Sequence, residues 1–282
     1  MTIRIIGDTT SGLTKEQADK YGIDFIPQII VFQDKSYRDD TEMNSQTFVK
    51  KLQESPVLPK TAAPPPVLYN PIYEDMMKKG QDGIIICPSS KMSGTVRSAT
   101  TALKDFPDLK VRIIDSQSIA SGIAMMLLEA KKLADNGASL DDIEERVRYM
   151  MAHEHFYGVV DTLEYLYKGG RIGGASKLVG ELLQIKPILT LKDGEVQPFE
   201  KQRTKKRAMA RMVELVKNEC PKDPEKAMLT LSALDTSPDL PFLRKEFHDL
   251  LNISEIPYFN VPAGIMVHAG PTVVVIDYFT ES

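Results

Sequence analysis

The chain has 282 residues, 42% of them hydrophobic, and its 35 basic and 39 acidic side chains give a net charge of -4. This length allows one large domain or two medium domains with a sizeable core. The small negative charge removes the electrostatic basis for nonspecific nucleic-acid binding or for attachment to an anionic membrane surface.

The chain shows neither a targeting segment nor a covalent framework. Its start, MTIRIIGD, reads directly into a strand without the apolar region of a signal peptide, and no apolar run approaches the length that spans a bilayer. Cys87 and Cys220 make neither a disulfide framework nor a metal knuckle, and the histidines lack metal-ligand spacing. We therefore expect a cytoplasmic protein with no metal, no cofactor, no nucleic-acid partner and no integral membrane segment.

In the first half of the chain, apolar runs alternate with helical patterns. A strand at 2–8 leads through DTTSG to a helix at 14–22, where the closing glycine is typical of a C-cap. The sequence then predicts a strand at 23–32, a turn at 33–40, a helix at 44–55, a proline-rich connector at 55–66, a helix at 67–79, strands at 83–87 and 109–115 with a helix at 95–106 between them, and helices up to residue 153. The connector cannot form regular helix or a central strand.

Three hydroxyl-rich loops follow three of these apolar strands: DTTSG, CPSSKMSGT and DSQSIASG. In a parallel sheet such loops emerge at one carboxyl edge, where ligands bind, and the helix N-termini there favour an anion. The candidate contacts are Ser93, Gly94 and Thr95 in the second loop and Ser116 in the third. Because no phosphate-binding glycine motif is present, a single carboxylate suits the loops better than a polyphosphate. The alternative is three capped helices with no ligand.

The second half of the chain restarts with a strand near residue 154. The pattern then predicts a short helix at 162–168, an apolar helix at 175–184, a hairpin around Asp193-Gly194, a basic helix from 204, a strand near 230, a helix at 238–251 and two closing strands, 256–261 and 272–279. The predicted class is α/β, with an N-terminal Rossmann-like parallel-sheet domain at 1–152 and a C-terminal α/β domain at 153–282.

Four charged or titratable residues of this half stand out. His268 is the only ionisable residue in a long apolar stretch, so we expect it to be buried, bonded either to the backbone or to a ligand. Lys168 and Arg171 flank a Gly-Gly pair, and we expect this turn to be exposed. Arg203 begins a basic segment that forms either a solvated face or a partner surface.

Taken together, these motifs resemble the DegV family. The blocks DTTSGL, Thr61 before proline, SSKMSGT, DSQSIASG, TLEYLYKGGRI, KPIL followed by DG and KQRTKKRA, and HAGP occur in the family's order over nearly the whole chain. The resemblance implies a fatty-acid-binding subunit of bacterial fatty acid kinase, with the acid buried between two domains. It implies that Thr61, Ser93 and His268 bind the carboxylate and that Arg171 and Arg203 dock the kinase subunit. Ala62 departs from the pattern and supplies no hydroxyl.

We therefore expect a carrier that binds a long-chain fatty acid and presents its carboxylate to a separate ATP-dependent kinase, and that is not itself an enzyme. One alternative is a hydrolase with Ser93 as nucleophile and His268 as base, although no GxSxG motif is present. A second alternative is a regulatory binding module for another small carboxylate.

Overall fold

The computed structural model describes residues 2–181, 185–221, 223–251 and 256–280, and its first half is built on a parallel sheet, sheet A. The strand order is β2-β1-β6-β7, with β1 at Ile3–Asp8, β2 at Asp24–Ile26, β6 at Asp82–Cys87 and β7 at Val111–Asp115. Ile84, Ile85 and Ile86 are each at most 2% exposed, so β6 is buried on both faces. A continuous β-branched run is the pattern of such a strand, as the sequence predicted.

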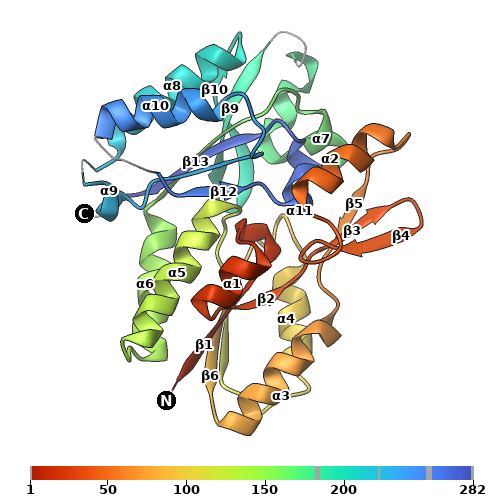
Figure 1. The fold of residues 1–282 in the computed structure, drawn as a ribbon, viewed down its shortest axis with the longest axis vertical. Helices are drawn as coiled ribbons and strands as arrows, with labels where there is room; N and C mark the ends of the chain where they lie inside the picture. Colours follow the sequence, from red (N-terminus) through yellow and green to blue (C-terminus); the bar gives the residue numbers. More distant parts are fainter. Residues whose placement is uncertain (1, 182–184, 222, 252–255, 281–282) are drawn as a thin grey trace.

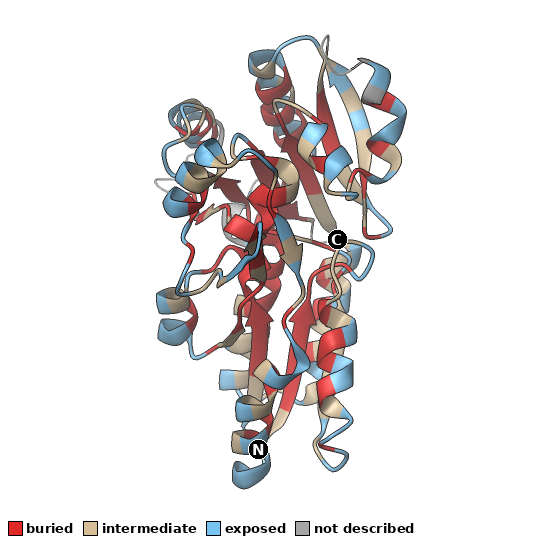
Figure 2. Cartoon of the chain, turned by 90° about the vertical axis from the view of Figure 1, so that its right-hand side faces the viewer, coloured by how far each residue is buried: buried red, intermediate tan, exposed pale blue. Residues whose placement is uncertain are grey.

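Helices cover both faces of sheet A, as Figures 1 and 2 show. Ile6, Ile85 and Cys87 pack on one side with α3 and α4, and Ile5 and Ile84 pack on the other with α5 and α6. The helices are α1 at Lys15–Tyr21, α3 at Asn70–Lys79, α4 at Thr95–Leu103, α5 at Ser121–Asp135 and α6 at Leu140–Ala152. The predicted C-cap is confirmed, because Gly22 ends α1 in the left-handed conformation at φ 67°.

A small antiparallel sheet, sheet B, corrects two sequence predictions. The run at 23–32 is not one strand: it divides at Pro27 into β2 of sheet A and β3 at Ile29–Phe32 of sheet B. The segment expected to be a turn contains β4 at Lys35–Arg38, which pairs with β3. The proline-rich connector contributes the edge strand β5 at Lys60–Ala62, and its pairing places Thr61 opposite Ile30. The helix α2 at Ser45–Glu54 packs on this sheet through Phe48 against Phe32, whereas the 3₁₀ turn η2 at Pro66–Tyr69 packs with α3 and α4 on sheet A.

The second half forms a larger mixed sheet, sheet C, with the order β10-β9-β8-β13-β11-β12. Its strands are β8 at Glu154–Val159, β9 at Lys186–Lys192, β10 at Glu195–Gln202, β11 at Thr230–Ala233, β12 at Tyr258–Asn260 and β13 at Val274–Phe279. Only the β11–β12 pair is parallel among the described strands of this sheet. The predicted hairpin is confirmed, since Asp193 and Gly194 join β9 to β10 with φ of 51° and 76°.

The two faces of sheet C pack against different partners. Val274 and Ile276 point to the face covered by α8 at Lys205–Glu219, α9 at Pro224–Ala227 and α10 at Leu240–Leu251. In Figure 1, α8 and α10 lie at the top and α9 lies at the left. Val275 points to the opposite face, which packs on the first half of the chain. On that side lie η1 at Thr9–Ser11, α7 at Glu164–Lys168, η3 at Gly173–Glu181 and α11 at Ala263–Ala269. The helix expected at 175–184 is a 3₁₀ segment up to Glu181, and its last residues lie outside the described part.

A hydrophobic cluster joins the two halves, so the chain has a shared interior where they meet. It contains Ile30, Phe48 and Ala120 from the first half together with Phe156 and Val275 from sheet C. The strands of sheets A and C come from residues before 116 and after 153, and the exact domain boundary at 152/153 remains a prediction.

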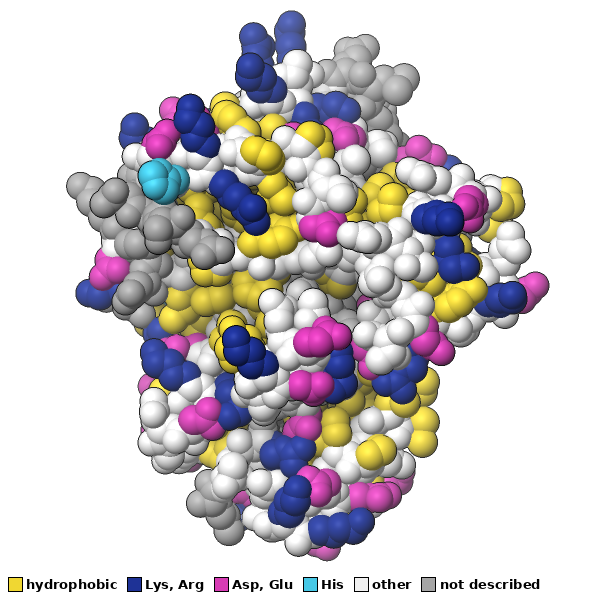
Figure 3. Space-filling model, viewed as in Figure 1, with side chains coloured by type: hydrophobic (Ala, Val, Ile, Leu, Met, Phe, Trp, Pro, Cys, Tyr) yellow, Lys and Arg dark blue, Asp and Glu magenta, His cyan; other side chains and the backbone are white. Residues whose placement is uncertain are grey.

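Figure 3 shows acidic and basic side chains interspersed over the surface, with hydrophobic side chains gathered across the middle of this face. Among the described residues, no helix is both long and apolar enough to cross a bilayer.

Candidate binding pocket

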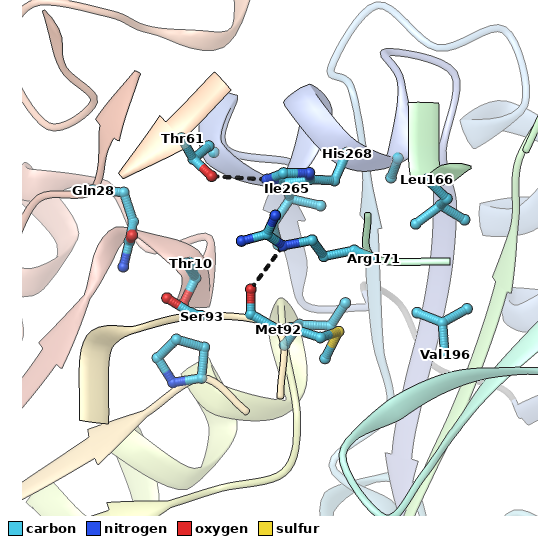
Figure 4. A pocket seen from close by; sticks show the side chains of 14 residues that line it. Thr10, Gln28, Thr61, Met92, Ser93, Leu166, Arg171, Val196, Ile265 and His268 are labelled. Atoms are coloured by element: carbon cyan, nitrogen blue, oxygen red, sulfur yellow. Dashed lines mark hydrogen bonds between the residues drawn. The ribbon is translucent and has the colours of Figure 1, made fainter. Parts of the chain in front are cut away.

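The hydroxyl-rich loops of sheet A converge on one pocket, as the sequence predicted. Thr10 comes from the loop after β1, Met92 and Ser93 from the loop after β6, and Ile119 from the loop after β7. The facing wall comes from sheet B, α7, β10 and α11, so the pocket lies where the two halves of the chain meet (Figure 4). Its space outside protein atoms, open solvent included, is about 580 Å³. The apolar lining residues are Pro88, Met92, Ile119, Leu166, Val196, Ile265 and Ala269.

Thr61 and His268 form the first polar group of this pocket. The Thr61 Oγ1 atom lies 2.7 Å from His268 Nε2, although 207 positions separate the two residues. Thr61 is held by the pairing of β5 with β3, and His268 lies in the last turn of α11. Burial and then the charge of Arg171 lower the pKa of His268 to about 4, so the imidazole is neutral at pH 7. His268 is half-buried rather than buried, and its partner in the described structure is a side chain rather than the backbone.

Ser93 is the second polar group, and it has a different set of contacts. Its Oγ lies 2.8 Å from Thr95 Oγ1 and 3.3 Å from the Thr95 backbone nitrogen, which donates to it. The helix α4 starts here with Gly94 at the N-cap position and without a side-chain cap. The other hydroxyls of this loop are engaged elsewhere: Ser89 donates to the Gly194 carbonyl and Ser90 to Asp115. Ser93 is therefore the hydroxyl of this loop that faces the pocket.

Arg171 is not the fully exposed residue that the Gly-Gly turn predicted. It is half-buried and lines the pocket, with its Nε donating to the Met92 carbonyl at 3.1 Å and its Nη1 to the Gly169 carbonyl at 2.7 Å. In Figure 4 its guanidinium lies between the Thr61–His268 pair and Ser93. The turn itself is exposed at Lys168, as expected. Packing of α7 on α11 explains the difference, because it brings the turn against His268.

The remaining predicted site residues lie away from the pocket surface. Thr95 is buried directly behind Ser93 and does not line the pocket. Gly94 is the N-cap residue of α4, and it does not line the pocket either. Ser116 is buried in the third loop, where its hydroxyl accepts a hydrogen bond from the Ser118 nitrogen, and it lines a separate polar cavity near Glu154 and Gly194. Arg203 is exposed between β10 and α8 and lines neither this pocket nor the groove outside it.

Two lining residues, Thr10 and Gln28, escaped the sequence argument. Gln28 is 3% exposed, and its amide nitrogen donates to Asp8 at 2.8 Å and to Thr95 Oγ1 at 2.9 Å. The sequence pattern places Gln28 inside a strand, whereas the chain leaves β2 just before it and enters β3 just after it. The Pro27-Gln28 pair inside the apolar run was the available signal, because proline interrupts a strand.

A surface groove adjoins the pocket and shares its polar corner. Thr61, Arg171 and His268 line both, so these three residues separate the interior space from the outside. The rest of the groove consists of the connector from Ser55 to Lys60 together with Lys168, Gly169 and Val267. Within the described chain, no cluster of three or more His, Cys, Asp or Glu side chains could hold a metal ion.

These features define a two-domain α/β protein whose pocket lies at the carboxyl edge of a parallel sheet, where sheets of this kind bind small ligands. The chain belongs to the DegV family: the profile described as "Uncharacterised protein, DegV family" matches residues 2–281. A DegV domain-containing protein of Clostridium perfringens is 35% identical over 288 residues, which cover 100% of both chains. The resemblance found from the sequence blocks is thus confirmed.

Solved structures of the family have the same fold. A DegV family protein from Thermus thermophilus, described as fatty acid binding, matches with a TM-score of 0.89 at 28% identity and covers 100% of both chains. DegV of Bacillus subtilis, described as a fatty acid binding protein, matches with a TM-score of 0.87 at 28% identity, covering 99% of this chain and 100% of that one. Both parts of the predicted fold class, the parallel sheet and the second α/β unit, are confirmed.

Proposed function

We propose that this protein binds one long-chain fatty acid and presents its carboxylate to a separate ATP-dependent kinase subunit, which forms the acyl phosphate. The observation that carries the proposal is the combination of Thr61, Ser93 and His268 in one pocket. Thr10, Gln28 and Arg171 add to this polar side, and the other side chains that line the pocket are apolar. The fatty-acid-binding relatives support the ligand class. The kinase partner rests on the family resemblance of Arg171 and Arg203.

The polar corner can offer several donors to one carboxylate. Neutral His268 has one N–H, and none of the described residues is a hydrogen-bond partner of its Nδ1. A buried unpaired N–H is rarer than an unpaired acceptor, so the proton belongs on Nε2, where Thr61 accepts it. The Thr61 hydroxyl then donates into the pocket beside Ser93. Arg171 adds guanidinium N–H groups and a positive charge at the same corner.

The apolar lining supplies most of the affinity in this account. The lining residues Leu166, Val196 and Ile265 belong to the hydrophobic cluster that joins the two halves of the chain. At about 0.8 kcal/mol for each buried CH₂, a chain of roughly 14 methylenes contributes on the order of 11 kcal/mol before ordering costs. The hydroxyl and imidazole groups then fix which end of the ligand faces the groove.

The groove explains how a buried ligand could meet a second protein. Thr61, Arg171 and His268 have one side toward the pocket and one toward the groove, so a carboxylate bound there lies next to the surface. A kinase docked over the groove could reach the carboxylate without releasing the acyl chain. Exposed Arg203 could contribute to the surface that the kinase contacts.

The geometry of Ser93 and His268 supports a stand-alone hydrolase less well than it supports a fatty-acid carrier. Among the described residues, the Ser93 hydroxyl is bonded to Thr95 and not to His268, and His268 Nε2 is bonded to Thr61. In the part of the chain that the structure describes, no carboxylate bonds to His268 Nδ1, whereas a catalytic triad would require one to orient the ring.

Denaturing mass spectrometry of the purified protein tests the proposal. We expect one copurifying fatty acid for each chain, and no hydrolysis of model esters by the lipid-bound or the delipidated protein. Another small carboxylate in its place would favour the regulatory binding module. An empty protein that hydrolyses esters would contradict the carrier function.

A further inference from the structure

The groove outside the pocket carries positive charge. Three of the described residues that line it are charged, namely Lys60, Lys168 and Arg171, and none of those described is an acid. Lys60 precedes Thr61 on β5 and Lys168 ends α7, and both lysines are exposed. The chain as a whole has a net charge of -4, so this gathering of cations is local. The groove therefore attracts an anion.

Arg171 joins this groove to the polar corner of the pocket, because it lines both. Its Nε and Nη1 atoms donate to the Met92 and Gly169 carbonyls, which fixes the plane of the guanidinium. Within the described chain, Arg171 has no carboxylate partner, and its Nη2 atom makes no hydrogen bond. A half-buried cation without a counter-ion loses hydration without gaining an ion pair, so an anion bound beside it is favoured.

The turn from Lys168 to Arg171 lies directly against His268. A Cβ added to Gly169 would lie 2.4 Å from His268 Nδ1, so a side chain at this position would not fit. The two cations therefore flank, in sequence, a residue that touches the imidazole. The Lys168 ammonium bonds to Glu164 at 2.5 Å, but Glu164 does not line the groove, and an exposed pair of this kind is weak. Lys168 remains available to an anion in the groove.

We infer that Lys60, Lys168 and Arg171 form a subsite for the phosphoryl group of the acyl phosphate, so that the protein holds the product of the proposed phosphorylation as well as its substrate. This inference rests on the proposed function. In that reaction a carboxylate oxygen bonds to the γ-phosphorus of ATP, the bond from that phosphorus to its bridging oxygen breaks, and ADP leaves with the electron pair. The head group then carries a charge of about -2 in place of about -1, and the groove supplies the cations that this added charge requires.

Equilibrium dialysis of delipidated full-length protein at pH 7.5 tests this inference with two tritiated probes. One is myristate, and the other is the β-ketophosphonate in which a CH₂ group replaces the bridging oxygen of myristoyl phosphate, so that it cannot hydrolyse to the acid. The measured quantity is the ratio of the two affinities, which does not depend on the fraction of active protein. We expect the wild-type protein to favour the phosphonate. The Lys60→Gln/Lys168→Gln double variant should lower this preference roughly tenfold, or about threefold for each lysine.

Two single variants serve as matched controls. Glu164→Gln removes the partner of Lys168 and should raise the preference for the phosphonate by about twofold. Lys104→Gln removes the same charge as the lysine variants at the exposed C-terminal end of α4, outside both pocket and groove, and should keep the wild-type ratio.

The outcomes separate the inference from the function on which it rests. An unchanged ratio in the double variant, an equal fall in Lys104→Gln, or a wild-type protein that binds myristate and excludes the phosphonate would overturn the subsite while leaving fatty-acid binding intact. A wild-type protein that binds neither probe would overturn both the subsite and the proposed function.

Discussion

The Thr61 hydroxyl and the His268 imidazole depend on each other more than on any other side chain of the pocket. Their 2.7 Å contact leaves the Thr61 proton available to a ligand when His268 carries a proton on Nε2 and donates it to Thr61 Oγ1. Sequence reasoning could identify both residues but not the contact, because 207 positions separate them and β5 was read as connector. The predicted full exposure of Arg171 is wrong for a similar reason. Its Nε donates to the Met92 carbonyl, which belongs to another loop, and the sequence does not place the two side by side.

At Thr61 and Ser93, loss of a hydroxyl should weaken ligand retention. Thr61→Val and Ser93→Ala each remove one hydrogen bond to a charged group, and we expect a cost of roughly 1.5–3 kcal/mol, or about tenfold to a hundredfold in fatty-acid affinity. Thr61→Ser keeps the hydroxyl and should retain most of the affinity. Fatty-acid exchange rates and bound content measure the effect. Wild-type exchange in both deletion variants would rule out these residues as the carboxylate site.

The two arginines should separate binding from docking. Arg203 is exposed and away from the pocket, so Arg203→Glu should keep its fatty acid and lose acyl-phosphate formation only when the kinase subunit is limiting. Arg171 faces both pocket and groove, so Arg171→Glu should reduce fatty-acid content as well. Turnover as a function of kinase concentration, with lipid content measured on the same samples, distinguishes the two. Full turnover of Arg203→Glu at limiting kinase would remove Arg203 from the interface.

At the scale of elements, hydrophobic pattern and turn residues predicted most of the strands and helices but not how strands are grouped into sheets. The run at 23–32 is mostly apolar on both sides of Pro27-Gln28, so hydrophobic periodicity alone gives no sign that β2 and β3 belong to different sheets. The segment KSYR is polar because β4 is exposed on three of its four residues, and such a strand has no apolar signal. For this reason the sequence pattern does not show that Gln28 lies in the link between β2 and β3.

The β9–β10 hairpin gives a prediction at this scale, because its turn touches the second hydroxyl loop. Gly194 has φ 76°, and a Cβ there would lie 2.5 Å from Ser89 Oγ. Gly137 has φ 82°, and a Cβ added there would meet no atom within 4 Å, so it is a matched control for backbone strain alone. We expect Gly137→Ala to cost about 1 kcal/mol of unfolding free energy and Gly194→Ala at least about 1 kcal/mol more.

Chemical denaturation measures both changes, and removing the Ser89 hydroxyl tests the cause. In a Ser89→Ala background the extra cost of Gly194→Ala should shrink, because the crowded atom is gone. Equal costs for the two glycine variants in the wild-type background would show that the hairpin does not press on the hydroxyl loop.

At the scale of the whole molecule, the two halves meet through buried acids as well as through the hydrophobic cluster. Asp277 of β13 is fully buried and accepts from Ser121 of α5, and Ser118 donates to Glu154 of β8 at 2.5 Å. Burial raises the pKa of Asp277 to about 7, and burial together with the charge of Asp277 raises the pKa of Glu154. In the unfolded chain these two carboxyl groups lose their protons above the ordinary carboxyl pKa of about 4. In the folded protein they keep their protons to a higher pH.

The sign of the resulting pH dependence is fixed. The stabilisation is fully present below about pH 4, where the unfolded carboxyl is also protonated, and is lost as pH rises through about 7. We expect the unfolding free energy to fall between pH 5 and pH 8 by roughly 2–4 kcal/mol from this source. Asp277→Asn should flatten that slope, and Asp108→Asn, at an exposed position, should not. Parallel slopes for wild type and Asp277→Asn would contradict the assignment.

The central claim is that Thr61, Ser93, His268 and Arg171 together hold an ionised fatty-acid carboxylate, and NMR of bound palmitate labelled with ¹³C at its carboxyl carbon tests it most directly. Hydrogen-bond donors and a positive charge favour the ionised form, whereas an apolar enclosure without them favours the neutral acid. We predict that the bound carboxyl titrates at a lower pH than a carboxylic acid in water, and that Ser93→Ala raises this value. A bound carboxyl that titrates at or above the value in water, unchanged by Ser93→Ala, would contradict the account.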